Sequence, residues 1–389
     1  MRLSKKIPGS VWTLGFVSLF MDVSSELIHS LLPVFLVSAL GASMFTVGLI
    51  EGMAESTALI VKVFSGMISD RLGRRKGLAV LGYGLGAVSK PVFALAGSVH
   101  WVFIARFTDR IGKGIRGAPR DAMIADLTST EVRGAAYGLR QTLDTIGAFL
   151  GPLLGIVLMI RLAGDFRQVF WYATIPAFLA VSLLAAGVKE PGRKHADAAA
   201  APRINLASLK LFDSKYWWVV AIGGLLTLAR FSEAFLILRA QTIGLPDTFA
   251  PAVLISLNLV YALSAYPAGI LADRIDHAHL ITAGLVILIG ADLALAHAQG
   301  LRLVFTGVML WGLHMGITQG LLAAMVAETA PEKLRGTAFG VFNLISGITM
   351  LFAGILAGSL WDSFGASVTF YAGGVIALAA LFLLLLRKH

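Results

Sequence analysis

The chain has 389 residues, of which 57% are apolar and only 14% are charged, and its formal net charge is +10. Soluble domains have about 45–50% apolar and about 25% charged residues, so this composition excludes an ordinary soluble protein and indicates a membrane protein. The sequence contains no cysteine, which also excludes a disulfide framework and thiolate metal sites.

Twelve apolar segments are long enough to cross a bilayer, which takes about 20 helical residues. We expect them at about residues 11–39, 45–69, 77–97, 100–119, 135–161 and 167–187, and then at about 215–238, 249–272, 278–298, 301–326, 337–361 and 366–387. A polar stretch separates the two sets of six. We therefore predict an all-α membrane protein with an N-terminal six-helix bundle (1–188), a cytoplasmic linker (189–214) and a C-terminal six-helix bundle (215–389).

The first two segments carry acidic side chains where a membrane helix is normally apolar. Asp22, Glu26 and His29 share one face of the first helix, and Glu51 and Glu55 are four residues apart on the second. A charge at membrane depth costs at least about 2.5–3.5 kcal/mol, so these residues are candidates for function. They carry the coupling proton, bind a divalent cation such as Ni²⁺, Co²⁺, Zn²⁺ or Mn²⁺, or are neutralised by buried basic residues. The basic residues available for that neutralisation are Lys62, Lys90, Arg140 and Arg230.

The loop after the second segment has the pattern G-x-x-x-D-R-x-G-R-R-K. This complete match resembles the signature loop of the major facilitator superfamily of transporters. The resemblance implies a conformational latch made of Gly66, Asp70, Arg71, Gly73, Arg74 and Arg75, with a second, shorter copy that includes Asp273 and Arg274. An ordinary basic loop explains the arginines but not the spacing between the glycine and the aspartate.

Arg106 lies within the fourth segment, and an arginine at membrane depth usually faces protein or water and has a carboxylate partner. In proton-coupled members of the superfamily, the corresponding arginine modulates a nearby protonatable acid. The alternative is that Arg106 lies at the cytoplasmic end of its helix and pairs with Asp109.

The fifth segment contains a charged pair and a glycine–proline motif. Arg140 and Asp144 are four residues apart and therefore share one helix face. The motif G-x-x-x-G-P-x-x-G follows, at Gly147, Gly151, Pro152 and Gly155. Its glycines let two helices approach closely and its proline bends the helix. It resembles the motif of antiporter branches of the superfamily, which implies export by exchange, while packing without directional meaning is the alternative.

The second half has fewer polar residues within its helices. Arg230 and Glu233 lie three residues apart on the seventh segment, and His314 lies on the tenth. We include them among the candidate substrate- or proton-binding residues, although a lone histidine more often forms a hydrogen bond between helices.

The two halves repeat each other, because Gly66, Asp70 and Arg71 recur about 200 residues later at the same spacing. Parallel repeats are typical of transporters with a substrate site between two bundles. Basic residues lie mainly in alternate loops, which predicts that both termini are cytoplasmic. Their spread indicates contact with anionic lipid and argues against binding of nucleic acid.

The phrases around 22–29 and 109–121 are similar to a prokaryotic branch of the superfamily that includes nickel-resistance permeases, but the chain lacks a His-rich tail. We predict a monomeric inner-membrane transporter that exports a small solute, either a divalent metal cation or a drug-like compound, in exchange for protons. We expect no cofactor and no enzymatic activity. The alternative is a proton-coupled symporter that imports a small organic anion bound by Arg106, Arg140 and Arg230.

Overall fold

The computed structural model describes residues 7–72, 75–190, 206–272 and 274–386, and within these ranges the regular structure is entirely helical. Among the described residues, 11 helices are long and apolar enough to cross a membrane. They coincide with 11 of the twelve predicted segments, which confirms a multi-pass all-α protein. Large apolar side chains such as Phe64, Leu81, Ile175 and Phe382 are exposed on the helices, as expected for surfaces that face lipid.

The segment predicted at 100–119 is the exception. The helix α5 (Val99–Leu127) occupies this region and has 29 residues, enough to cross a bilayer. It is not among the apolar spans because it carries Arg106, Asp109, Arg110 and Arg116, all of which are buried. Its length therefore fits the prediction, while its polar residues are turned into the protein interior.

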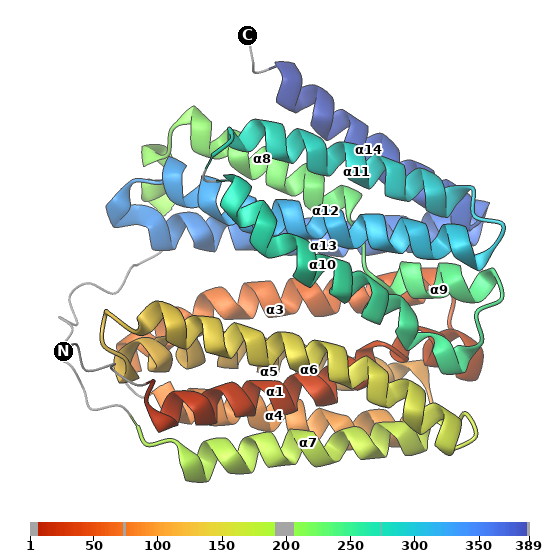
Figure 1. The fold of residues 1–389 in the computed structure, drawn as a ribbon, viewed down its shortest axis with the longest axis horizontal. Coiled ribbons are helices and arrows are strands. Elements are labelled where there is room, and N and C mark those ends of the chain that lie inside the picture. The colour runs from red at the N-terminus through yellow and green to blue at the C-terminus, as the bar shows by residue number, and fades with distance from the viewer. Residues whose placement is uncertain (1–6, 73–74, 191–205, 273, 387–389) are drawn as a thin grey trace. The chain divides into compact units, whose positions relative to one another are not determined.

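The chain divides into two compact units, one made of residues 1–31 and 57–201 and the other of residues 32–56 and 202–389. The helices of the first unit are α1 (Gly9–His29), the later part of α3 (Met44–Leu72), α4 (Arg75–Leu95), α5, α6 (Arg133–Arg161) and α7 (Phe166–Gly187). Within this unit α1 packs against α6 and α7, and α4 packs against α5 and α7 (Figure 1).

The second unit contains the start of α3 and the helices of the second half. These are α2 (Leu32–Val34), α8 (Ser214–Ala229), α9 (Ala234–Thr242), α10 (Pro251–Ala272), α11 (His277–Ala296), α12 (Leu301–Thr329), α13 (Arg335–Phe364) and α14 (Ala366–Leu386), with a π-helical turn at Phe35–Ala39 and short 3₁₀ turns at Leu206–Leu211, Asp247–Phe249 and Glu332–Leu334. Here α12 packs against α10 and α11, and α14 packs against α8 and α11 (Figure 1).

One membrane-length segment of the second unit is interrupted. The segment Ser214–Thr242 is long enough to be a single span, but α8 ends at Ala229 and α9 begins at Ala234. The amide of Arg230 still donates to the carbonyl of Leu226 at 3.0 Å, and Ser232 Oγ accepts from the amide of Ala234 at 3.3 Å. The carbonyl of Leu226 is thus the last one in α8 that accepts a helical hydrogen bond among the described residues. The carbonyl groups that follow it, up to Ala229, lack partners within their own helix, as at any helix C-terminus.

Within the second unit, the start of α3 crosses α13 where both helices have glycine. A β-carbon on Gly354 would collide with the main chain of Gly48, and one on Gly48 would collide with the main chain of Gly354. The two backbones are thus in direct contact, as small residues allow in membrane helices.

We expect Gly354→Ala to lower the free energy of unfolding by about 1–3 kcal/mol, because the added methyl group overpacks this crossing. The matched control is Gly290→Ala on α11, since a β-carbon on Gly290 would meet no atom within 4 Å. Thermal unfolding of the two purified variants checks the prediction. Equal stability of the two variants would contradict it.

Candidate functional site

The acidic face of α1 is held against the glycines of α6. A β-carbon on Gly147 would lie 3.0 Å from Cβ of Asp22, and one on Gly151 would lie 2.9 Å from Cβ of Glu26. Each would also lie 2.8 Å from a carbonyl oxygen of α1. The two glycines Gly147 and Gly151 of the predicted antiporter motif are therefore the positions at which α6 packs against the β-carbons of Asp22 and Glu26 and the backbone of α1. Pro152 lies next to this contact, inside α6, and is buried together with Gly155.

Glu26 has a local partner on the same helix. Its Oε2 lies 3.3 Å from Nδ1 of His29, and their side chains are 20% and 12% exposed. Among the described residues, no group of three or more His, Asp or Glu side chains is arranged to hold a metal ion. The pair supplies two donors, which is fewer than the three protein ligands of a catalytic zinc site.

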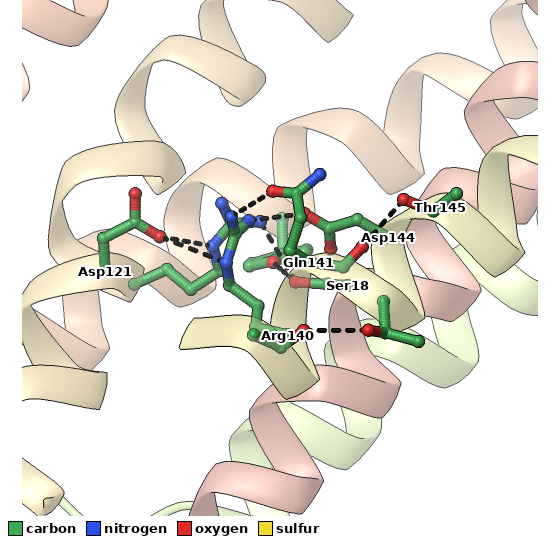
Figure 2. Close-up of polar contacts among 10 residues, drawn as sticks. Ser18, Asp121, Arg140, Gln141, Asp144 and Thr145 are labelled. Atoms are coloured by element: carbon green, nitrogen blue, oxygen red, sulfur yellow. Dashed lines mark hydrogen bonds and ion pairs between the residues drawn. The ribbon is translucent and has the colours of Figure 1, made fainter. Parts of the chain in front are cut away.

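Arg140 and Asp144 form the ion pair predicted from their spacing, which confirms that expectation (Figure 2). Arg140 Nη2 also donates to Oε1 of Gln141 at 2.8 Å, and its Nε lies 3.9 Å from Oδ1 of Asp121. The guanidinium group thereby joins α6 to α5. Its side chain is 13% exposed, so the pair is shielded but not sealed from solvent.

A second arginine connects this cluster to α1. Arg120 Nε donates to Oδ1 of Asp121 at 3.1 Å, and its Nη1 donates to Oγ of Ser18 at 3.0 Å. Ser18 Oγ in turn lies 3.2 Å from the hydroxyl of Tyr83 on α4. The face of α1 that carries Asp22 is therefore bound by polar contacts to α4 and α5 (Figure 2 labels Ser18, Asp121 and Arg140).

A fully buried ion pair joins α4 to α5. Lys90 Nζ lies 2.7 Å from Oδ1 of Asp109 and donates to Oγ of Ser25 at 3.0 Å. Both charged side chains are at most 3% exposed, and Arg110 Nε lies 3.6 Å from the other oxygen of Asp109. Lys90, which the sequence offered as a partner for the acids of the first two helices, thus pairs with Asp109 on α5 instead.

Basic side chains outnumber acidic ones around this network. Arg106 is 2% exposed on α5, and the guanidinium of Arg116 lies 4.9 Å above the ring of Tyr83. The basic residues on the helices of this unit include Lys62, Lys90, Arg106, Arg110, Lys113, Arg116, Arg120 and Arg140, and the acidic residues include Asp22, Glu26, Asp109, Asp121 and Asp144. The network therefore carries an excess of positive charge when all of these groups are ionised.

The other predicted binding residues belong to the second unit. Glu51 is buried and Glu55 is half-buried, both on α3. Arg230 and Glu233 lie in the interruption between α8 and α9. His314 on α12 is buried, and its Nδ1 lies 2.8 Å from the carbonyl oxygen of Gly284 on α11. His314 thus has the interhelical contact that was considered as its alternative role.

The predicted latch is described only in part. Gly66 lies on α3 and Arg274 is exposed after α10, whereas the side chains of Asp70 and Arg71 and the whole of Gly73, Arg74 and Asp273 lie outside the described residues. Arg75 begins α4, and its Nη1 lies 2.5 Å from Oδ2 of Asp126 near the end of α5. This contact ties the latch loop to α5.

Glu190 was not anticipated from the sequence. Its Oε1 accepts from the amide of Arg75 at 2.6 Å, and its Oε2 accepts from the amide of Lys76 at 3.1 Å. A carboxylate is favourable at this place because helix N-termini have unpaired N–H groups and a positive end of the dipole. The available signal was an acid just after the last apolar segment of the first half, but its partner is more than 100 positions away.

The sequence model of the Major Facilitator Superfamily matches residues 14–258 and 234–389. The chain belongs to the major facilitator superfamily. It is 31% identical over 389 residues to an uncharacterized MFS-type transporter of Methanocaldococcus jannaschii, covering 98% of this chain and 95% of that one.

Two solved structures share this superfamily fold. The nucleoside transporter NupG has a TM-score of 0.79 at 12% identity, covering 97% of this chain and 98% of that chain. The human organic anion transporter TETRAN has a TM-score of 0.67 at 19% identity, covering 96% of this chain and 98% of that chain. Membership of this superfamily, with the 11 candidate spans, makes the protein a multi-pass membrane transporter of a small-molecule substrate.

We expect Lys90→Met to lower the free energy of unfolding by about 3–5 kcal/mol, because it leaves the Asp109 carboxylate buried without its main partner. The double variant Lys90→Met/Asp109→Leu removes both charges and should regain most of this loss. Thermal unfolding followed by tryptophan fluorescence measures both effects. A double variant no more stable than the single one would show that the two residues are not coupled.

Proposed function

We propose that this transporter exports a small solute in exchange for protons and that Asp22 and Glu26 on α1 are the groups that bind the protons. The observation that supports the proposal is the fit of these acids onto Gly147 and Gly151. A change in the bend at Pro152 necessarily changes the surroundings of both acids. Proton binding and helix movement are thus coupled in one contact, which is what exchange requires.

In this mechanism the basic residues set the balance of charge around the acids. Arg140 and Asp144 form an ion pair on α6. Arg106 on α5 modulates the protonation of Asp22 and Glu26. A solute that enters competes with the proton for the same electrostatic environment. Release of one then favours binding of the other, since each shifts the equilibrium only by its different affinity for the two conformations.

The excess of positive charge favours a solute that carries a negative group, in contrast to a divalent metal cation. Arginine recognises carboxylate and phosphate groups through two parallel hydrogen bonds. The same observation supports a second candidate function, a proton-coupled symporter that imports a small organic anion bound by Arg106, Arg140 and Arg230. TETRAN is an organic anion transporter of the same fold, which agrees with an anionic substrate in either direction.

The remaining parts of the proposal concern topology. We place the protein as a monomer in the inner membrane, with two parallel six-helix repeats and both termini in the cytoplasm. The loop that contains Asp70 and Arg71 is then cytoplasmic and acts as the latch. Two contacts anchor the start of α4 beside this loop: Arg75 pairs with Asp126 on α5, and Glu190 accepts from the amide of Arg75. We propose that the loop forms and breaks its latch contacts next to this anchored helix end.

The direction of transport is tested in inverted membrane vesicles with an acidic interior and a pH-sensitive dye. Addition of solutes from a panel of organic anions, amphiphilic drugs and Ni²⁺ or Zn²⁺ should release protons from the vesicles for the solute that is exported. A protonophore abolishes this signal. Entry of protons together with the solute would establish the symporter instead.

In the same assay we expect Asp22→Asn and Glu26→Gln to abolish solute-driven proton release while exchange of labelled solute continues. The amides keep the shape of the side chains but cannot bind the proton. Asp165→Asn is the matched control, because Asp165 caps α7 by accepting from the amide of Arg167 at 3.0 Å and lies in the loop after α6. Full proton release by both α1 variants would remove the acids from the mechanism.

The topology is tested with single cysteines, which the natural chain lacks. A cysteine at Ser98 or Ser363 should react with a membrane-impermeant maleimide in whole cells. A cysteine at Ser129 or Ala199 should react only after the membrane is opened. Labelling of the Ser98 position from the cytoplasmic side would refute the predicted helix count.

A further inference from the structure

Asp292 is a buried acid that the proposed function does not use. It lies in α11 and is 0% exposed. Within the part of the chain that the structure describes, neither of its carboxylate oxygens has a hydrogen-bond partner. Burial of a carboxylate without a partner is so costly that such a group either neutralises or binds a cation.

A carbonyl oxygen of the interrupted helix faces the same space as this carboxyl group. A β-carbon on Gly373 of α14 would lie 2.9 Å from Oδ2 of Asp292 and 3.3 Å from the carbonyl oxygen of Ala229. It would also lie 3.0 Å from Cε1 of Phe231. Glycine at this position therefore leaves room beside both oxygens, and a ring edge closes the third side.

Ala229 is the last residue of α8. Its carbonyl group lies at the negative end of the helix dipole, where carbonyls lack partners inside the helix. Membrane transporters commonly bind Na⁺ or H⁺ at the carbonyl ends of interrupted helices. An acid and such a helix end together form a site for a small cation.

The surroundings favour a proton over a metal ion. Among the described residues no group of three or more His, Asp or Glu side chains gathers here, whereas hard metal cations take about six or more oxygen ligands. The walls are aromatic: the ring of Phe231 lies 5.5 Å from that of Phe370 and 5.4 Å from that of Trp311. One proton converts the carboxylate into a neutral group, which this apolar site tolerates.

The charged and titratable groups of the neighbouring elements are engaged elsewhere or displaced along the chain. On α12, His314 contacts Gly284, which is two helical turns before Asp292 on α11. On α14, the hydroxyl of Tyr371 lies 3.0 Å from Nε2 of His297. Arg230 and Glu233 flank the interruption after α8, and among the described residues neither is a hydrogen-bond partner of the Asp292 carboxylate.

We propose that Asp292 binds a proton in the conformation described here and lies as a neutral carboxylic acid near the carbonyl end of α8. The carboxylate takes up one H⁺ and releases it when the end of α8 moves away. This is a protonation site of the second unit, separate from the acids of α1. It depends on the packing of α8, α11 and α14 alone and is independent of the direction of transport.

Infrared spectroscopy of the purified full-length protein, recorded as the difference between the natural protein and Asp292→Asn, tests the proposal without substrate or gradient. We expect a carbonyl-stretch band of a protonated carboxyl group at neutral pH that shifts in D₂O. The band should disappear in Asp292→Asn and persist in Asp22→Asn. Its absence from the natural protein, or its survival in Asp292→Asn, would overturn the proposal.

A pair of glycine variants decides the matter if Asp292→Asn does not fold. Gly373→Ala places a methyl group against Oδ2 of Asp292 and should shift the band. Gly374→Ala is the matched control, because its β-carbon would make only an ordinary contact of 3.6 Å with Cβ of Asp292. A band that Gly373→Ala leaves unchanged would show that it arises from another carboxyl group.

Discussion

The cost of placing charge in an apolar interior constrains most of this molecule. The helices of the first unit carry many more charged side chains than a membrane span tolerates, and the structure resolves this by packing them against one another. The Lys90–Asp109 pair shows the principle, since each of these side chains is buried and bonded to the other. The polar network then requires helices that approach closely, and the glycines of α6 supply that approach to α1. The packing of the helices and the arrangement of the polar network therefore depend on each other.

Local pattern was sufficient to predict much of the fold. Apolar runs located 11 helices correctly because the bilayer sets both the length and the polarity of a span. The pattern was incomplete at α5. The length of this helix was predicted, but its many charged residues keep it out of the set of apolar spans. The interruption after Ala229 was also not predicted, since the sequence around Arg230 contains neither proline nor glycine. The break is a tertiary effect, and a propensity argument does not detect it.

The candidate site was predictable to the same degree. Spacing on one helix identified the Arg140–Asp144 pair and the shared face of Glu26 and His29, because residues three and four apart are neighbours. Contacts between different helices could not be predicted from the spacing of residues along one helix. The partner of Lys90, the links from Arg120 to Ser18 and the cap by Glu190 depend on how distant segments pack. Asp292 was overlooked because it stands alone in the sequence, and only its burial beside a free helix end gives it significance.

The interruption between α8 and α9 has a mechanical consequence. Bending an intact helix such as α13, which has 30 residues, disrupts backbone hydrogen bonds that each contribute about 0.5–1.5 kcal/mol. Between Ala229 and Ala234 the regular helix is already interrupted, so we expect the two pieces to pivot there at a lower cost than an intact helix would require. We expect bending of this span to be concentrated at the interruption. The surroundings of the Asp292 carboxyl group, which lies near the end of α8, would therefore change with the angle between α8 and α9.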